Sequence, residues 1–265
     1  MKKITSLFVA MLLLLSSCGS VPLTGRKQVL LVSDQEVLSS SLTQYSDYMK
    51  SAKKSSSKDG AAMVTRVGKK IAAATEQYLI NNGLESEIKN FAWEFNLVND
   101  PQVNAFCMPG GKIVVYEGLM QLVSSDDELA VVVGHEVAHA VAKHSNERMS
   151  QQLMAQYGAQ ILGQALSNKS AAVQKIGASV YGLGAQYGVM LPFSRKHESE
   201  TDYMGLVFMA MAGYNPAVAV NFWQKMSAGK SGSTPEFMST HPSDATRINE
   251  IKQHLPEIEK YRVKK

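Results

Sequence analysis

The chain has 265 residues, of which 45% are hydrophobic and 19% are charged. This composition is ordinary for a globular protein that forms one large domain or two small ones. The formal net charge is only +4, and the sequence has neither a basic run nor basic residues interleaved with aromatic ones. The composition and charge therefore give no support for a nucleic-acid-binding protein.

The first 17 residues are typical of an export signal. Lys2 and Lys3 precede an apolar run over 4–15, which is too short to span a bilayer comfortably. Two serines then stand directly before Cys18, and small residues in that position resemble a bacterial lipoprotein signal, in which the cysteine becomes the lipidated first residue. The alternative is an ordinary signal peptide with an incidental cysteine.

Lipidation of Cys18 would have three consequences for the mature chain. Removal of Lys2 and Lys3 lowers the net charge from +4 to +2. Cys107 remains as the one free thiol of the two cysteines, so no internal disulfide can form. Gly19 stands where a retention signal would place Asp, so we expect a lipid-anchored protein of the outer membrane that faces the periplasm.

The first half of the mature chain predicts an irregular lead over 18–32, then two helices, then a few strands. Ser33 and Glu36 form a capping box that opens the first helix, and apolar residues at helical spacing support the second. Alternating and β-branched residues favour three strands, with a hairpin turn at Pro109-Gly110-Gly111 between the last two. The expected elements are helices over 33–50 and 61–82 and strands over 91–98, 103–108 and 113–116.

The second half predicts helices throughout. Residues 145–192 are rich in small residues, which favours two closely packed helices that act as a lid, as a membrane-facing surface or as plain core. A few strands followed by many helices predict a mostly helical α+β domain over 33–265, preceded by the signal over 1–17 and the lead over 18–32. The expected helices cover 126–144, 145–192, 201–211, 217–228 and 243–261.

The motif His-Glu-Val-Ala-His carries the clearest chemistry. His135 and His139 lie four residues apart, so on a helix both rings leave the same face and can bind one Zn²⁺. Glu136 is rotated by about 100° around the axis. That position suits a base that takes a proton from water on the metal better than it suits a ligand. Two core histidines are the alternative, although valines and alanines around the motif indicate a buried helix where bare imidazoles need partners.

A hydrolytic zinc site needs a third protein ligand and one open position. The charged segment 193–202 contains Glu198 and Asp202, which share a helix face, whereas Glu200 points about 160° away from Glu198. We assign Glu198 as the third ligand and Asp202 as the hydrogen-bond acceptor of a ligand histidine, with His135 preferred. Glu200 is left as a solvated charge.

Two more histidines are placed outside the metal site. His197 has no carboxylate four residues later on its own face. His144 lies five residues past His139, and the extended zincin pattern would need glycine at 142 and histidine at 145, where this chain has Ala142 and Ser145. We therefore interpret His144 as structural.

Four motifs, in order, resemble the HtpX and CAAX-prenyl-endopeptidase family of zinc metallopeptidases: "VVVGHEVAHAVAKHS", "ESETD", "FMAMAGYNP" and "STHPSDATRI". The lead "VPLTGRKQVLLVS" resembles the exported lipoprotein branch of that family, and the match covers about residues 22–252. The resemblance implies a gluzincin fold, with an active-site helix, a small sheet whose edge strand holds substrate, and a helix that supplies the glutamate ligand. Some members span the membrane near 150–190, but Gln174, Lys175 and Gln186 argue against a transmembrane helix here.

The same resemblance gives the predicted hairpin a role. Zincins bind a peptide as an added strand at a sheet edge, where main-chain hydrogen bonds supply affinity. The run 103–108 resembles that edge strand, with Asn104 and Ala105 as the expected substrate contacts. A plain core hairpin is the alternative for these side chains.

His241 lies in a loop before the last predicted helix, and Arg247 lies on the second turn of that helix. A neutral His241 above the zinc could donate a hydrogen bond to the oxyanion, could bind the zinc at rest and keep the enzyme latent, or could only brace the loop. We favour the resting ligand, because an unrestrained peptidase among unfolded proteins would be hazardous. Arg247 should hold the loop or the carbonyl side of the substrate.

These observations favour a zinc-dependent endopeptidase with one Zn²⁺ per chain, acting on unfolded or misassembled envelope proteins at the membrane surface. One alternative is an envelope assembly factor or holdase whose zinc site is mostly latent. Another is a hydrolase of a non-peptide bond. The intact motif together with Glu198 favours the endopeptidase.

Overall fold

The computed structural model describes residues 18–185, 191–228, 236–241 and 245–263. The expected signal segment over 1–17 lies outside the described residues, as do 186–190 of the expected helix over 145–192 and the first two residues of the expected helix over 243–261. The described chain is mostly helical, with two small sheets, which confirms the predicted α+β class. None of its helices combines the length and the apolarity needed to cross a membrane.

The larger sheet has three strands in the order β3-β5-β4. Strand β3 (Glu94–Val98) pairs in parallel with β5 (Lys112–Tyr116), and β4 (Ala105–Met108) pairs antiparallel with the other side of β5. Gly110 and Gly111 in the predicted hairpin turn both have positive φ, at 97° and 78°, which glycine adopts without strain. Because the strand order is β3-β5-β4, strand β4 lies at the edge of this sheet, as the family resemblance implied.

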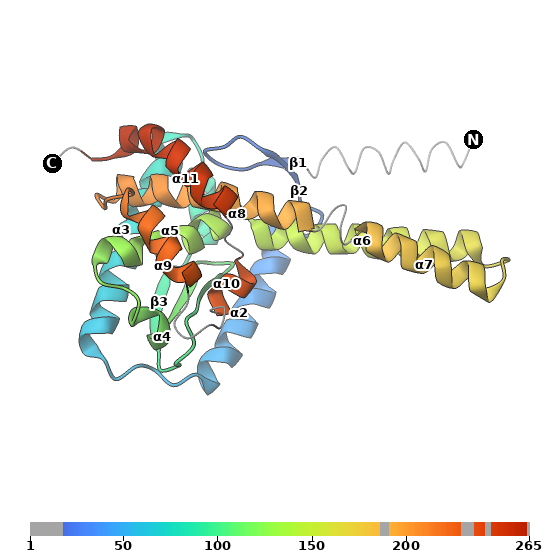
Figure 1. Ribbon diagram of the computed structural model, residues 1–265, viewed down its shortest axis with the longest axis horizontal. Helices are drawn as coiled ribbons and strands as arrows, with labels where there is room; N and C mark the ends of the chain where they lie inside the picture. The colour runs from blue at the N-terminus through green and yellow to red at the C-terminus, as the bar shows by residue number, and fades with distance from the viewer. Residues whose placement is uncertain (1–17, 186–190, 229–235, 242–244, 264–265) are drawn as a thin grey trace.

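The helices form the body around this sheet (Figure 1). The predicted capping box is present at the start of the first described helix, where the Ser33 side chain accepts a hydrogen bond from the backbone of Glu36 and the Glu36 side chain accepts one from the backbone of Ser33. Besides the helices introduced below, the described elements are α2 (Asp34–Ser51), α3 (Lys58–Asn81), η1 (Glu85–Asn90), α4 (Glu117–Met120), α9 (Val218–Ala228), α10 (Glu236–Thr240), α11 (Ala245–Ile258) and η3 (Glu259–Tyr261).

The lead over 18–32 differs from the irregular segment that we expected. Strand β1 (Cys18–Ser20) pairs antiparallel with β2 (Lys27–Val29), so the lead forms a small hairpin whose backbone groups bond to each other. The turn of this lead hairpin includes Gly25, with a φ of 67°. The Arg26 side chain of this hairpin bonds to Glu147 and Glu200 of the body.

The predicted helix over 126–144 is interrupted before its end. Helix α5 (Asp126–Val141) ends at Val141, and α6 (His144–Leu166) begins at His144. Lys143 between them has the left-handed backbone conformation, with φ 55° and ψ 34°. Non-glycine residues rarely adopt this conformation, and it turns the chain sharply between the two helices.

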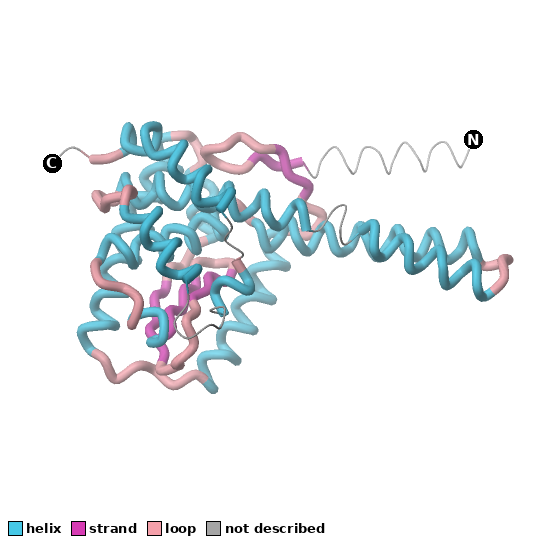
Figure 2. The backbone as a smooth tube through the Cα atoms, viewed as in Figure 1, coloured by secondary structure: helices cyan, strands magenta, loops and turns pink. Residues whose placement is uncertain are grey.

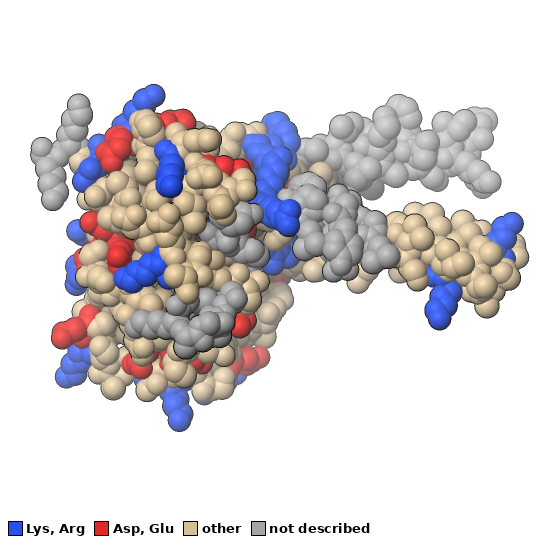
Figure 3. Space-filling model, in the orientation of Figure 1, with Lys and Arg blue, Asp and Glu red and all other residues tan. Residues whose placement is uncertain are grey.

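Helix α6 and helix α7 (Ala171–Ala185) run side by side as an arm that projects away from the body (Figures 1 and 2). They pack closely where a Cβ on Gly158 would meet the Tyr181 ring and one on Gly177 would meet Leu166, which confirms the predicted helix pair. Large apolar side chains nonetheless remain exposed along the arm, among them Tyr157 (59%), Ile161 (68%), Ile176 (64%) and Val180 (65%). The arm is therefore neither plain core nor a cover over the body, and its visible face carries basic but no acidic side chains (Figure 3).

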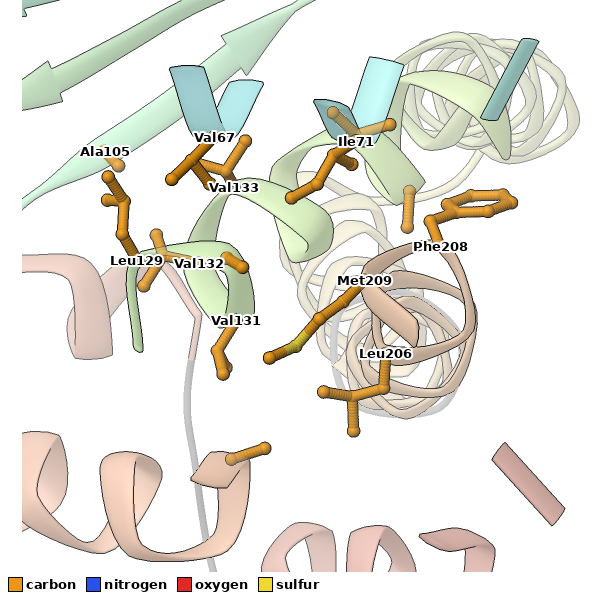
Figure 4. Close-up of a cluster of buried hydrophobic side chains, with 14 of the residues drawn as sticks. Val67, Ile71, Ala105, Leu129, Val131, Val132, Val133, Leu206, Phe208 and Met209 are labelled. Atoms are coloured by element: carbon orange, nitrogen blue, oxygen red, sulfur yellow. The ribbon is translucent and has the colours of Figure 1, made fainter. Parts of the chain in front are cut away.

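Helices α5 and α8 (Leu191–Met211) cross in backbone contact at the centre of the body. A Cβ atom on Gly134 of α5 would lie 2.7 Å from the carbonyl oxygen of Gly205 of α8, and one on Gly205 would lie 2.7 Å from the carbonyl carbon of Gly134. Fully buried side chains such as Ile71, Val133 and Phe208 surround the crossing (Figure 4). Only glycine at both positions permits this approach, which brings one face of α8 against the motif of α5.

Candidate metal centre

Three histidines and one glutamate converge where α5 and α8 cross. His135 and His139 come from α5, Glu198 from α8, and His241 directly follows α10, and one ligand atom of each lies within 4.8 Å of the others. The Nε2 atoms of His135 and His139 are 3.2 Å apart, and the Glu198 carboxylate lies 3.3 Å and 3.4 Å from them. The structure thus brings together the three ligands predicted from the sequence.

The donor set fits a zinc ion. Two imidazole nitrogens and a carboxylate are typical zinc ligands. The Nδ1 atom of His135 bonds to Asp202, so its Nε2 faces Nε2 of His139 and the Glu198 carboxylate, which is 1% exposed. These three groups need a cation among them, either a proton or a metal ion. Burial lowers the pKa of His135, but Asp202 and Glu198 more than offset this and raise it to about 9, which shows how strongly these carboxylates attract positive charge.

Asp202 lies where the sequence predicted it. Its Oδ1 is 3.0 Å from Nδ1 of His135, a contact that fixes the ring and its tautomer. Arg247 donates two hydrogen bonds to Asp202, of 2.6 Å and 2.9 Å, and further bonds of 3.2 Å to Glu198 and to the carbonyl of His241. Arg247 is 5% exposed, so of its two predicted roles the structure supports holding the loop.

Glu136 has the surroundings of a base. It is 2% exposed, and its Oε2 accepts a 2.9 Å hydrogen bond from the backbone N–H of Cys107 in β4. Its buried Oε1 has no hydrogen-bond partner among the described residues and lies 3.6 Å from Nε2 of His241. Burial raises the pKa of Glu136. One oxygen is thus held while the other is available to accept a proton.

The contact of Cys107 with Glu136 was not predicted from the sequence, because a backbone amide leaves no signature in the side-chain pattern. It also shows that β4 passes directly beside the α5 motif. The two residues expected to bind substrate precede this contact: Asn104 accepts a 2.9 Å hydrogen bond from the backbone of Ala105, and Ala105 is 1% exposed. Ala105 therefore presents almost no surface, in its side chain or its backbone, to a peptide in this structure. A cleft opens beside the strand, and its walls include Leu38, Phe91, Cys107, Pro109, His139 and Lys143.

One interpretation made from the sequence is wrong, and another needs an addition. Glu200 is not solvated: it is 8% exposed, and its Oε2 lies 3.0 Å from Nε2 of His144. His144 stays outside the cluster of possible ligands around His135, in line with the structural role expected for it, but its Nδ1 lies 2.9 Å from Nδ1 of His139, a contact that the sequence did not predict. His197 lies 2.9 Å from Glu147 and is not in the group that could hold the metal with His135, as predicted. The lead hairpin and α6 cover the face of α8 that we had taken as solvent-exposed.

Known proteins similar to this chain are peptidases. Over 183 residues it is 36% identical to the mitochondrial metalloendopeptidase OMA1 of Schizosaccharomyces pombe, which covers 66% of this chain and 50% of that protein. It is 28% identical over 254 residues to the human metalloendopeptidase OMA1, mitochondrial, covering 91% and 46%. It is 32% identical over 174 residues to the beta-barrel assembly-enhancing protease of Yersinia pestis, covering 61% and 36%. The chain spans half or less of the length of these relatives.

The family description "Peptidase family M48" matches residues 66–255, which include the α5 motif, Glu198, Asp202 and His241. This match covers most of the chain, and it agrees with the predicted metalloendopeptidase class. The resemblance noted in the sequence is thereby confirmed at the level of the family, while its exported lipoprotein branch stays a prediction. The chain belongs to peptidase family M48.

Proposed function

We propose that this chain is a zinc-dependent endopeptidase that binds one Zn²⁺ through His135, His139 and Glu198. The observation that carries the proposal is the cluster of buried and half-buried ligand side chains with the buried Glu136 carboxylate beside it. Bound zinc would lower the pKa of a water molecule and polarise the scissile carbonyl. Side chains and backbone groups of this chain would transfer the proton and bind the peptide.

Glu136 moves the proton in this proposal. Its Oε1 has no hydrogen-bond partner among the described residues, so it can take a proton from the attacking water and later deliver it to the leaving amine. The Cys107 N–H holds Oε2, which keeps the carboxylate oriented. Strand β4 supplies a sheet edge beside the base, where an extended peptide can add as a strand and present its carbonyl.

His241 supports a latent resting state. Its Nδ1 lies 3.2 Å from Nε2 of His135 and 3.1 Å from the Glu198 carboxylate, and the Phe237 ring stacks on the imidazole at 4.6 Å between centroids. With His241 the site has four protein ligands, which is the closed arrangement of structural zinc sites and leaves no position for water. We propose that His241 binds the metal at rest and moves away when a substrate enters.

A second candidate function is favoured by the same His241 contact. A permanently closed site would make the protein an assembly factor or holdase, whose cleft binds client chains without cleaving them. Casein degradation by the purified zinc-loaded protein separates the two. The endopeptidase proposal expects degradation that a chelator abolishes and added zinc restores, whereas casein that stays intact at full zinc occupancy would favour the holdase.

The substrates and location are proposed from the relatives and from the sequence. One relative is named as a protease that enhances β-barrel assembly. We propose unfolded or misassembled envelope proteins as substrates and a lipid anchor at Cys18 on the periplasmic side of the outer membrane. The exposed apolar arm and the absence of acidic residues from 148–197 suit contact with an anionic lipid surface. A Cys18→Ser variant that still sediments with membranes would contradict lipid as the sole anchor.

A further inference from the structure

The two histidines of the α5 motif are supported in different ways on the side away from the metal. Nδ1 of His135 contacts the Asp202 carboxylate directly, at 3.0 Å. Nδ1 of His139 instead lies 2.9 Å from Nδ1 of His144, whose Nε2 lies 3.0 Å from the Glu200 carboxylate. The second ligand thus reaches a carboxylate through another imidazole.

The proton positions along this chain of contacts follow from the metal site. Nε2 of His139 belongs to the ligand cluster, so its proton must be on Nδ1, from which it is donated to Nδ1 of His144. His144 then carries its own proton on Nε2 and donates it to Glu200. The Thr201 hydroxyl donates to the carbonyl of His197 at 2.5 Å, so it does not need the lone pair of His144.

We propose that His144 and Glu200 are positioning residues of the metal centre, a hydrogen-bonded relay that orients His139 and sets the zinc affinity. Carboxylates behind a ligand imidazole fix its orientation and raise its basicity. Asp202 performs this for His135, and the relay performs it for His139 across one additional ring. The inference rests on the proposed zinc site.

The lead hairpin completes the relay. Thr24 donates a 2.5 Å hydrogen bond to Oε1 of Glu200, and Nε of Arg26 donates a 2.8 Å bond to Oε2. The two terminal nitrogens of Arg26 bond to Glu147 at 2.9 Å and 2.7 Å. One guanidinium therefore compensates two buried carboxylates, and the segment before the first long helix contributes to holding a metal ligand.

Glu147 provides a matched control for Glu200. Its side chain is 3% exposed against 6% for Glu200, and it is bonded to the same Arg26. Its histidine partner, however, is His197 and not His144. Replacing Glu147 should disturb folding about as much as replacing Glu200, without interrupting the contacts that lead to His139.

The test is the zinc dissociation constant of the purified chain, measured by competition with a chromogenic chelator, together with thermal unfolding of the zinc-free protein. Glu200→Gln and His144→Leu should weaken zinc binding about 10- to 100-fold. Glu147→Gln should lower the unfolding temperature but weaken zinc binding much less than Glu200→Gln does, because the hydrogen bonds from His139 through His144 to Glu200 do not include Glu147. His144→Gln should bind zinc more tightly than His144→Leu, because its amide can accept from His139 and donate to Glu200.

Zinc binding by Glu200→Gln and His144→Leu that is as tight as in Glu147→Gln would overturn the relay. A wild-type protein that binds no zinc would instead contradict the proposed function, so the two failures are distinguishable. If Glu200→Gln does not fold, Thr24→Val decides, because it removes one bond to Glu200 at an exposed position. A weaker zinc affinity in Thr24→Val supports the relay, and an unchanged affinity overturns it.

Discussion

Neighbouring residues of the α5 motif differ in their proposed roles because their surroundings differ. His135 and His139 direct Nε2 into a cluster with Glu198, where a bound cation would satisfy all three groups. Glu136 lies one residue from His135, yet its Oε2 is held by the Cys107 backbone and its raised pKa favours proton acceptance. The sequence predicted both roles from rotation around the helix axis, and the contacts at this scale support them.

Glu136→Gln should separate metal binding from proton transfer. The variant should keep about one zinc per chain and lose about 10³-fold or more in peptidase activity, because the amide cannot accept the proton. Glu198→Gln is the comparison, and it should lose the metal. Metal analysis and peptide cleavage on the same preparations test this, and loss of zinc from the Glu136 variant would mean that Glu136 is a ligand.

His241→Ala distinguishes a resting ligand from a catalytic donor. If His241 closes the site at rest, its removal should raise peptidase activity, because the fourth position becomes open to water. If it stabilises the oxyanion, kcat should fall about 100-fold with zinc retained. Cleavage rates on one peptide and one protein substrate show whether activity rises or falls. Rates equal to wild type on both substrates would exclude both roles of His241.

At the scale of the elements, the metal centre depends on how closely α5 and α8 approach. The contact at Gly134 and Gly205 places Glu198 and Asp202 beside His135. The break between α5 and α6 has a comparable effect. On an unbroken helix, His144 would be rotated about 140° from His139, but left-handed Lys143 turns the chain and the two rings meet.

Gly205→Ala should therefore damage both stability and zinc binding. Its new methyl group would lie 2.7 Å from the α5 backbone, which cannot move as a flexible side chain can. Such overpacking costs about 1–3 kcal/mol and should shift Glu198 relative to His135. Thermal unfolding and zinc content measure the two effects.

Gly163→Ala is the control for Gly205→Ala. A Cβ atom at this α6 position meets no atom within 4 Å, so the substitution should be neutral or stabilise by up to about 1 kcal/mol through helix propensity. Full zinc occupancy in Gly205→Ala, with an unchanged unfolding temperature, would show that the helix crossing tolerates a side chain.

In the molecule as a whole, a second buried charge cluster joins the lead hairpin, α6 and α8. Arg26 connects Glu147 and Glu200, and His197 bonds to Glu147. Buried charges of this kind must be paired, because breaking one pair leaves a charge without solvation. The three segments are distant in sequence, so the cluster links the lead hairpin to the metal centre.

This cluster predicts acid sensitivity of the zinc-free protein. Burial alone would raise the pKa of Glu147, but hydrogen bonds from His197 and Arg26 lower it from 4.5 to about 2. The unfolded chain therefore takes up this proton at a higher pH than the folded chain. The stability contributed by Glu147 is fully present above pH 4.5 and is lost as the pH falls toward 2.

Urea unfolding of the chelator-treated protein, followed from pH 5 to pH 2, measures this loss. The unfolding midpoint should fall in the wild type as the pH decreases, and it should fall less steeply in Glu147→Gln, which has no proton to gain at that position. Equal slopes for the two proteins would show that Glu147 does not have a lowered pKa in the folded state.

The sequence by itself determined what depends on local geometry. The spacing of His135 and His139, and of Glu198 and Asp202, fixes each pair on one helix face whatever surrounds it. Most helix and strand segments, the hairpin turn and the edge position of β4 were predicted in the same way or from the family resemblance, although α8 begins at Leu191, ten residues before the expected start, and the lead forms a hairpin.

Only the tertiary structure decided which faces are buried and which atoms meet across the fold. Glu200 looked solvated because it points away from the helix face that carries Glu198 and Asp202, yet the lead hairpin places Arg26 there. The contact of His144 with His139 was not foreseen, because a break at Lys143 is not visible in an alanine- and valine-rich run. Both depend on packing between distant segments, and helical spacing within one segment carries no information about that packing.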